Sequence, residues 1–360
     1  MSKELLTSLK IISKMKRISK VWIATSICIF SFTCSVFAQQ RKEFVLKLLS
    51  QEPIERPKKS ELVRTVFSKN GKFKGTVARK EVSKYTSIYK FTLSDSIGNI
   101  IWKKDTFSSD PFIANDGSVI TWVLLGDIGP SRFSFYDPAG NLIKRTEPLW
   151  VACSKINPEI LPEGNYLILH VKKPDVQEGL LVFDLKGNLI KNYGPCDDYA
   201  VSPGLKNLII ASGGELRFYR DGNLIGKRKV ESPSARGMVI SPDGDYFAFL
   251  TRNRLSLFEV SNVKKLWQKD LKDKLRFTSV DLSLGAKRIV VGAAVDYVSH
   301  KLENKSYTYT RIYNKDGALL AEKKIEIDDF NVWIPEVNIS ADGLFLTIKT
   351  KTEVYKFELE

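Results

Sequence analysis

The chain has few residues of the types that carry most enzyme chemistry. Its 360 residues include only two histidines, four cysteines and three methionines. The histidines lack the short spacing of a zinc site, and no Cys-x-x-Cys pair occurs, so we expect neither a zinc site nor a thiol redox motif. The Gly-x-Ser-x-Gly elbow, the phosphate-binding loop and the dinucleotide-binding glycine fingerprint are also missing. These absences argue against the hydrolases, kinases and dehydrogenases that use such motifs, and we expect no cofactor.

The remaining catalytic candidates have simpler structural explanations. His170 lies in an apolar segment that predicts a strand, where a structural role is expected. His300 lies in the longest predicted loop, residues 296–305, and is a candidate for ligand contact. Adjacent aspartates are more often solvated loop ends than metal ligands. Two such pairs form the alternative prediction of a divalent-metal or acid–base site: Asp197, Asp198, Asp328 and Asp329.

An apolar run near the N-terminus predicts export. Basic residues between positions 14 and 20 precede the run, which covers residues 21–37 and ends at Val36-Phe37-Ala38, a pattern suited to signal peptidase. We therefore expect residues 1–38 to be a signal peptide, with Met15 as an alternative start, and the protein to be periplasmic or secreted. The other interpretation is an uncleaved membrane anchor. We expect contact with the membrane only through this segment, and only if it is not cleaved.

The chain is strongly basic. The first 38 residues hold six lysines or arginines and one glutamate, so their removal lowers the formal net charge from +15 to +10. A basic exported protein attracts acidic proteins, anionic glycans or lipid headgroups. The sequence has no basic helix and no long run of like charge, so it gives no support for nucleic-acid binding. We expect a protein or acidic-glycan partner, no nucleic acid, and a monomer.

Two cysteines remain after such a cleavage, Cys153 and Cys196. They lie 43 residues apart, each near the start of a repeat. A disulfide between neighbouring repeats is one prediction, because an oxidising compartment permits it. Two buried thiols are the alternative.

Two interleaved series of turns predict an all-β fold, a single β-propeller. The first series recurs about every 45 residues, which is a propeller-blade period. Its glycines are Gly71, Gly117, Gly164, Gly204, Gly244, Gly285 and Gly343. The second series has the form Gly-Asn followed by two aliphatic residues, with Gly-Ala-Leu-Leu as a late variant and Ser261-Asn262-Val263 in its place in the fifth unit. Its glycines are Gly98, Gly140, Gly187, Gly222 and Gly317.

Each repeat therefore predicts four short strands joined by a tight turn, a variable loop and a second tight turn, which is one propeller blade. We expect seven blades in residues 39–360, with six or eight as alternatives because the sixth repeat is long. The last repeat ends before its fourth strand. The apolar segment at residues 43–49 is expected to supply that strand and close the ring, which leaves no open sheet edge between the ends of the repeat array.

Parts of the repeat resemble known propeller families. The turn Ser241-Pro242-Asp243-Gly244, followed by an apolar strand, resembles the repeats of bacterial WD40-like and lactonase-like propellers. The Gly98-x-x-x-Trp102 segment and the Leu266-Trp267 pair are similar to quinoprotein-type (PQQ-like) repeats. The resemblance covers residues 43–360 and implies a propeller. No Trp-Asp or Gly-His dipeptide occurs, so the chain is not a standard WD40 protein, and the tryptophan pattern is present in two units at most.

The longer loops point to one binding face. In a propeller, the loop between the second and third strands and the link between blades open on the same end of the blades, and the long loops here are of those two kinds. Aromatic and arginine side chains are typical of interaction hot spots. The candidates at this end are Trp150, Tyr199, Arg236, Arg276, His300 and Trp333. The alternative for the two tryptophans is packing between adjacent blades.

The sequence thus predicts an exported, non-catalytic binding or scaffold module of the cell envelope, and we expect no enzymatic activity. The competing hypothesis is a propeller enzyme of hydrolase or lactonase type, with the aspartate pairs at the channel mouth. A third is a domain that serves only to assemble a larger envelope complex.

Overall fold

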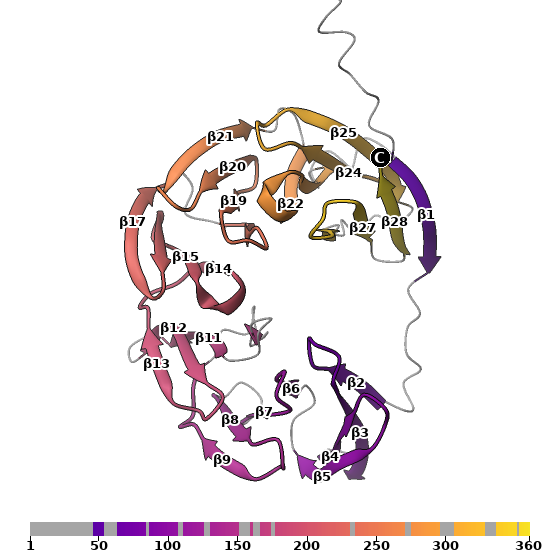
Figure 1. Cartoon of the computed structure of the whole chain (residues 1–360), viewed down its shortest axis with the longest axis vertical. Coiled ribbons are helices and arrows are strands. Elements are labelled where there is room, and N and C mark those ends of the chain that lie inside the picture. The colour runs from indigo at the N-terminus through magenta and orange to yellow at the C-terminus, as the bar shows by residue number, and fades with distance from the viewer. Residues whose placement is uncertain are drawn as a thin grey trace, which may run out of the picture. The chain divides into compact units, whose positions relative to one another are not determined.

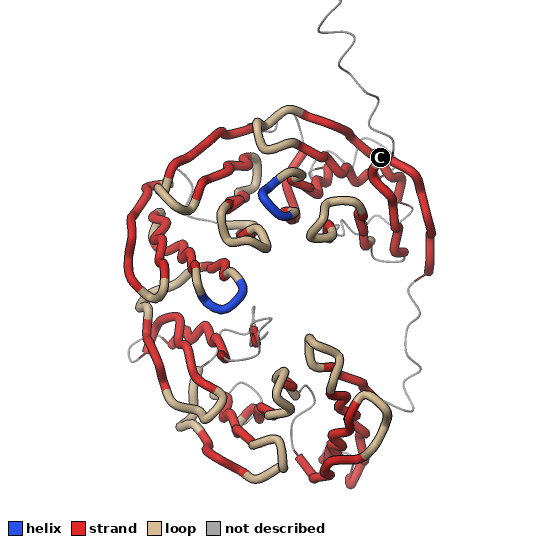
Figure 2. Tube along the Cα trace, in the orientation of Figure 1, coloured by secondary structure: helices blue, strands red, loops and turns tan. Residues whose placement is uncertain are grey.

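The computed structural model describes residues 46–53, 63–83, 86–106, 111–125, 130–150, 159–160, 166–173, 177–230, 235–270, 275–295, 306–327, 336–350 and 353–360. The chain divides into two compact units, Met1–Leu46 with Glu360, and Lys47–Leu359. The described residues of the second unit form strands, turns and two short 3-10 turns (Figure 2). Within the described residues, no helix is long and apolar enough to cross a membrane.

The fold is the predicted seven-bladed β-propeller. Twenty-eight strands are described, and they form seven antiparallel sheets of four strands each. Blades 1 to 3 contain β2 (Val63–Phe67), β3 (Phe73–Ser83), β4 (Thr86–Asp95) and β5 (Ile100–Thr106); β6 (Phe112–Ile113), β7 (Val119–Leu124), β8 (Ser131–Tyr136) and β9 (Leu142–Arg145); and β10 (Glu159–Ile160), β11 (Tyr166–Lys173), β12 (Gln177–Asp184) and β13 (Leu189–Asn192). Blades 4 to 6 contain β14 (Asp198–Val201), β15 (Asn207–Ser212), β16 (Glu215–Arg220) and β17 (Asn223–Lys229); β18 (Gly237–Ile240), β19 (Tyr246–Leu250), β20 (Arg254–Glu259) and β21 (Lys264–Asp270); and β22 (Leu275–Leu282), β23 (Ile289–Val295), β24 (Ser306–Tyr313) and β25 (Leu319–Ile327).

Blade 7 confirms the predicted closure by an N-terminal strand. It contains β26 (Glu336–Ile339), β27 (Phe345–Lys349) and β28 (Glu353–Leu359), and its fourth strand is β1 (Leu46–Pro53), which lies beside β28 (Figure 1). The Gln51 amide donates to the Glu353 carboxylate at 2.8 Å across this pair. Exposed contacts of this kind add little stability, so the strand ladder itself holds the closure. Residues 43–45 lie outside the described part of the chain.

Position within a blade decides how polar a strand is. The second strand of blade 4, β15, is buried at five of its six positions, because neighbouring blades cover both of its faces. The fourth strands β9 and β13 are exposed at every position and carry lysine, arginine or asparagine beside their aliphatic residues. Charged residues on such an unpaired edge prevent pairing with the edge of another sheet.

Apolar clusters join neighbouring blades. Each of the five clusters in the described residues takes side chains from two successive blades, from blades 1 and 2 through to blades 5 and 6. Between blades 4 and 5 the Phe218 ring packs edge-on against Phe247, with centroids 5.8 Å apart, and also contacts Phe258. Blades 6 and 7 are linked by the Leu284 amide, which donates to the Ala341 carbonyl at 2.8 Å.

Serines fix the turns of the first series. Five of these turns begin with a serine whose Oγ accepts a hydrogen bond from the backbone N–H five residues later, at 2.8 to 3.0 Å. These serines are Ser68, Ser202, Ser241, Ser283 and Ser340. The turns also contact one another: the Gly285 amide donates to Asp243 at 2.6 Å, from one blade to the next. All seven glycines of this series were predicted from the sequence, whereas of the serines only Ser241 was noted, as part of the Ser241-Pro242-Asp243-Gly244 turn. Gly164 lies outside the described residues.

Candidate functional site

The predicted binding end of the blades carries a group of arginines in blades 5 and 6. Arg236 directly precedes β18, and its N–H donates to the Leu250 carbonyl at 2.7 Å. Arg252 lies in the short loop that follows Leu250, and its carbonyl accepts from the Phe277 N–H at 2.8 Å. Arg276 is the neighbour of Phe277 on β22. Backbone hydrogen bonds thus hold Arg236, Arg252 and Arg276 near one another, and we call them the arginine surface.

Two of these arginines are exposed and the third, Arg276, is half-buried. Arg236 and Arg276 were predicted from the sequence, and Arg252 was not. Arg252 lies in a loop of only three residues between β19 and β20, whereas the prediction rested on the long loops. The signal available in the sequence was the position of Arg252, since every loop between a second and a third strand opens at this end.

The other binding candidates lie elsewhere or have a packing role. Trp150 is 38% exposed and follows β9 of blade 2, so it is not part of the arginine surface. Tyr199 is half-buried on β14 and packs on the apolar cluster between blades 3 and 4. His170 is buried on β11, as expected for a structural residue. His300 and Trp333 lie outside the described residues, so their assignment stays a prediction.

The acidic and cysteine candidates are described in part. Asp198 is buried and its Oδ1 accepts from the Tyr199 N–H at 2.7 Å, while Asp197 is exposed and its Oδ2 accepts from the Gly213 N–H at 2.8 Å. The Cys196 thiol is buried and donates to the Asp198 carbonyl at 3.4 Å. The other members of these predictions, Asp328, Asp329 and Cys153, fall outside the described residues, so the disulfide stays a prediction. In the part of the chain that is described, no group of three or more histidine, cysteine, aspartate or glutamate residues could hold a metal ion.

A concave site opens along the outer seam between blades 4 and 5. It consists of a pocket of about 380 Å³ and an adjoining pocket of about 310 Å³, and Arg228 lines both. We call the two pockets the seam groove. Its larger pocket is lined by Arg228, Lys229, Val230, Phe249, Thr251, Arg254, Ser256, Phe258, Lys264, Lys265 and Gln268. Its smaller pocket is lined by Ile225, Gly226, Lys227, Arg228, Ser261, Asn262 and Val263.

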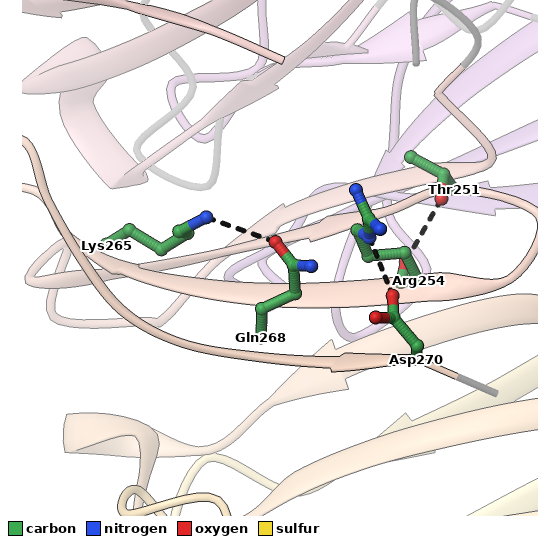
Figure 3. A network of polar contacts seen from close by, with 5 residues as sticks. All are labelled: Thr251, Arg254, Lys265, Gln268 and Asp270. Atoms are coloured by element: carbon green, nitrogen blue, oxygen red, sulfur yellow. Dashed lines mark hydrogen bonds and ion pairs between the residues drawn. The ribbon is translucent and has the colours of Figure 1, made fainter. Parts of the chain in front are cut away.

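Polar contacts fix one wall of the seam groove (Figure 3). The Arg254 Nε lies 2.6 Å from Asp270 Oδ1, and Lys265 donates to the Gln268 side-chain oxygen at 3.1 Å. The hydrogen bond and charge of Arg254 lower the pKa of the Asp270 carboxyl. The Thr251 hydroxyl donates to the Arg254 carbonyl at 3.4 Å. These contacts fix the position of Arg254, which lines the larger pocket together with Arg228, Lys229, Lys264 and Lys265.

The fold, and not a named family, relates the chain to known proteins. No family model and no curated protein matches the sequence. Among solved structures, 1062 chains match. One is described as the crystal structure of the eukaryotic initiation factor; it matches with a TM-score of 0.51 and 13% identity over 73% of this chain and 78% of that one. What is shared is the fold. At this identity the likeness carries no partner or activity across.

Proposed function

We propose that the protein is an exported, non-catalytic binding module that holds an acidic partner protein of the cell envelope at the loop end of its blades. The observation that supports this most directly is the arginine surface, which brings Arg236, Arg252 and Arg276 from two blades to one place. Guanidinium groups bind carboxylates in a fixed two-pronged geometry and are enriched at interaction hot spots.

The charge of the whole chain supports the same kind of partner. The formal net charge stays positive, at +10, after removal of the first 38 residues, and such a charge accelerates association with acidic surfaces. The acids that the competing enzyme hypothesis requires have a different role where they are described. Asp197 and Asp198 accept hydrogen bonds from backbone amides of their own blade, which suits a role in holding the local backbone.

The resemblance to bacterial WD40-like and quinoprotein-type repeats belongs to this proposal. Trp102 lies under the turn of the next blade at Gly140, and Trp267 lies under the turn at Gly317. These are the two units in which the sequence has the quinoprotein-like pattern. We propose that the protein is a scaffold related to these exported propellers and that it binds no quinone.

A capture experiment with paired variants tests the proposed function. The purified protein is used as bait for envelope and culture fractions at about 50 and 150 mM salt, because exposed charge contacts weaken as screening increases. We expect one acidic partner to remain bound at the higher salt. The variant Arg236→Ala/Arg252→Ala should lose that partner with its melting temperature unchanged within about 2 °C.

The matched control removes the same charge elsewhere. Lys72 and Lys186 are exposed lysines on turns at the opposite end of the blades. Lys72→Ala/Lys186→Ala should keep the partner. Equal loss of the partner in both double variants, or no partner at about 150 mM salt, would contradict the proposed function.

A further inference from the structure

We propose that the seam groove binds an acidic oligosaccharide, a sugar chain that carries carboxylate or sulfate groups. This site lies between the outer strands of blades 4 and 5 and does not include Arg236, Arg252 or Arg276. It is thus a second site, separate from the proposed protein-binding surface.

The groove exists because of an exchange of large and small residues. In blade 5, Trp267 pairs with Leu257, the last residue of β20 before a β-bulge. The Trp267 ring lies under the turn of the next blade at Gly317. In blade 4 the same register position is Gly226, and the next blade's turn carries Val263 where the other described turns of this series have glycine. The short Val263 side chain comes toward Gly226 and does not fill the space that an indole would occupy.

The groove is strongly cationic. Six lysine or arginine side chains line its two pockets, and no aspartate or glutamate lines either. Two of these cations have carboxylate partners: Lys227 lies 3.1 Å from Glu215, and Arg254 lies 2.6 Å from Asp270. The side chains of Lys229 and Lys264 have no carboxylate within ion-pair distance among the described residues.

Arg228 lies where the two pockets meet. Its Nε donates to the Val263 carbonyl at 2.8 Å, which anchors the guanidinium on the turn of blade 5. Only this one donor of the group is committed to the protein in the described structure, so the terminal nitrogens remain for a ligand. An anionic group bound here would be within reach of cations from both walls.

The shape of the groove suits a chain. Its lining follows β17 from Ile225 to Lys229 and continues to Val230, next to the turn of blade 5 at one end and next to Thr251 at the other. Five residue steps along a strand span about 17 Å. Neutral donors also line it, among them Ser256, Asn262 and Gln268, and such groups recognise sugar hydroxyls.

The composition of the lining favours a sugar chain over other anions. Bases of single-stranded nucleic acids stack on exposed aromatic rings, whereas Phe249 and Phe258 in the groove are only 4% and 3% exposed. A flat lipid surface does not enter a concave site between two blades. The exposed lining combines six cations and neutral donors with aliphatic side chains such as Ile225, which is 38% exposed. An acidic peptide, which places alternate side chains in apolar pockets, is therefore the competing ligand in the test below.

Binding titrations with defined probes test the inference. The purified protein is titrated at about 150 mM salt with an oligogalacturonate, a sulfated oligosaccharide, a neutral dextran oligosaccharide of equal length and a polyglutamate peptide. We expect at least one acidic oligosaccharide to bind at least tenfold more tightly than the neutral one and than the peptide. Comparison of the carboxylated and sulfated probes identifies the anionic group.

Two different variants should weaken binding for different reasons. Lys229→Ala/Lys264→Ala removes the two lysines without a carboxylate partner and should weaken binding at least tenfold, while Lys72→Ala/Lys186→Ala should change it less than twofold. Gly226→Trp/Val263→Gly keeps every charge but places an indole under a glycine turn, as at Trp267. It should fill the smaller pocket and weaken binding by a similar factor, with circular dichroism as the check of folding.

Three results would overturn the inference. Equal affinity for the acidic and neutral oligosaccharides would show that the charge of the groove is not used. Tighter binding of polyglutamate would assign the groove to an acidic peptide. Equal losses in the two lysine double variants would show that net charge and not the groove attracts the ligand. The variant Arg236→Ala/Arg252→Ala should keep its oligosaccharide affinity, so failure of the proposed protein partner leaves this test intact.

Discussion

Two seams of the propeller share the same strand register but exchange a large and a small residue. The seam between blades 5 and 6 has a tryptophan under a glycine, and the seam between blades 4 and 5 has a glycine under a valine. At the first, the Trp267 indole lies under Gly317, where an added Cβ would be 3.1 Å from the ring, and its Nε1 donates to the Lys315 carbonyl at 2.6 Å. At the second, Gly226 faces Val263, and a Cβ on Gly226 would lie 2.9 Å from the valine. The tryptophan closes its outer seam, and the valine leaves the seam groove.

The same position of the fourth strand, which pairs with the residue before the β-bulge and lies under the next blade's turn, differs between the other seams. Trp102 occupies it in blade 1, and lysines occupy it in blades 2 and 3. Lys144 donates to the Asn188 side chain in the next turn at 3.2 Å, and Lys191 donates to the Gly222 carbonyl. A long side chain at this position thus reaches the following blade whether its end is apolar or charged. At Gly226 no side chain spans the seam, and the smaller pocket of the seam groove lies there.

The largest effect is expected where a turn glycine covers a tryptophan. Gly140 has φ +87°, and an added Cβ would lie 2.8 Å from the Trp102 ring. Gly140→Val therefore combines backbone strain with a clash and should lower the free energy of unfolding by about 3 kcal/mol or more. Chemical denaturation measures this loss.

The control for this substitution separates strain from clash. Gly71 has φ +69° and nothing within 4 Å of an added Cβ. Gly71→Val should lower the free energy of unfolding by only about 1–2 kcal/mol, the strain alone. Equal losses at the two glycines would mean that the tryptophan does not determine the requirement for glycine.

The next largest effect concerns the tryptophan itself. Trp267 is half-buried, packs near the Tyr313 ring with centroids 6.2 Å apart, and makes the hydrogen bond to Lys315. Trp267→Ala should lower the free energy of unfolding by about 2 kcal/mol, below the range for a fully buried tryptophan. Lys269→Ala on the same strand should change it by less than about 0.5 kcal/mol. If the two substitutions had similar effects in urea denaturation, closure by the indole would be refuted.

The repeat pattern made the fold predictable, whereas the groove needs long-range register. Gly-Asn turns, alternating apolar residues and the missing last strand are all local signals, and they predicted seven blades and the closing strand β1. The Ser261-Asn262-Val263 departure from the glycine turn was visible in the sequence. Its consequence depended on Gly226, which is 37 positions earlier in the chain and meets Val263 only across a seam. Arg252 was missed for a different reason: its position between a second and a third strand was visible in the sequence, but its loop has only three residues.

The seam between blades 6 and 7 contains a half-buried carboxylate, Asp281, whose titration predicts a pH effect. Burial raises the pKa of the Asp281 carboxyl, although the N–H groups of Ile339 and Leu282 donate to it. The folded protein therefore keeps this proton to a higher pH than the unfolded chain, where the group titrates near pH 4. The stability that Asp281 contributes is present at acid pH and declines as the pH rises through the raised value.

Comparison with Asp281→Asn isolates this titration from all others. The free energy of unfolding of the wild type minus that of the variant should decrease from about pH 4 towards pH 7. Urea denaturation across this interval measures the difference. An increase with pH would mean that the two amide hydrogen bonds outweigh burial and that the pKa is lowered.

The smallest effect is expected at the valine of the open seam, and its sign is informative. Val263 is buried but has φ +56°, a conformation that β-branched residues avoid. Val263→Ala loses buried methyl groups and keeps most of the strain, whereas Val263→Gly loses slightly more and relieves the strain. We expect both to lower the free energy of unfolding by about 1 kcal/mol, with glycine no worse than alanine.

Val260 is the control, because it is also buried but has no positive φ. There the glycine variant should be less stable than the alanine variant by about 1 kcal/mol. If glycine were the worse residue at both positions in the same denaturation series, Val263 would not be a strained substitute for glycine, and the exchange that opens the groove would need another explanation.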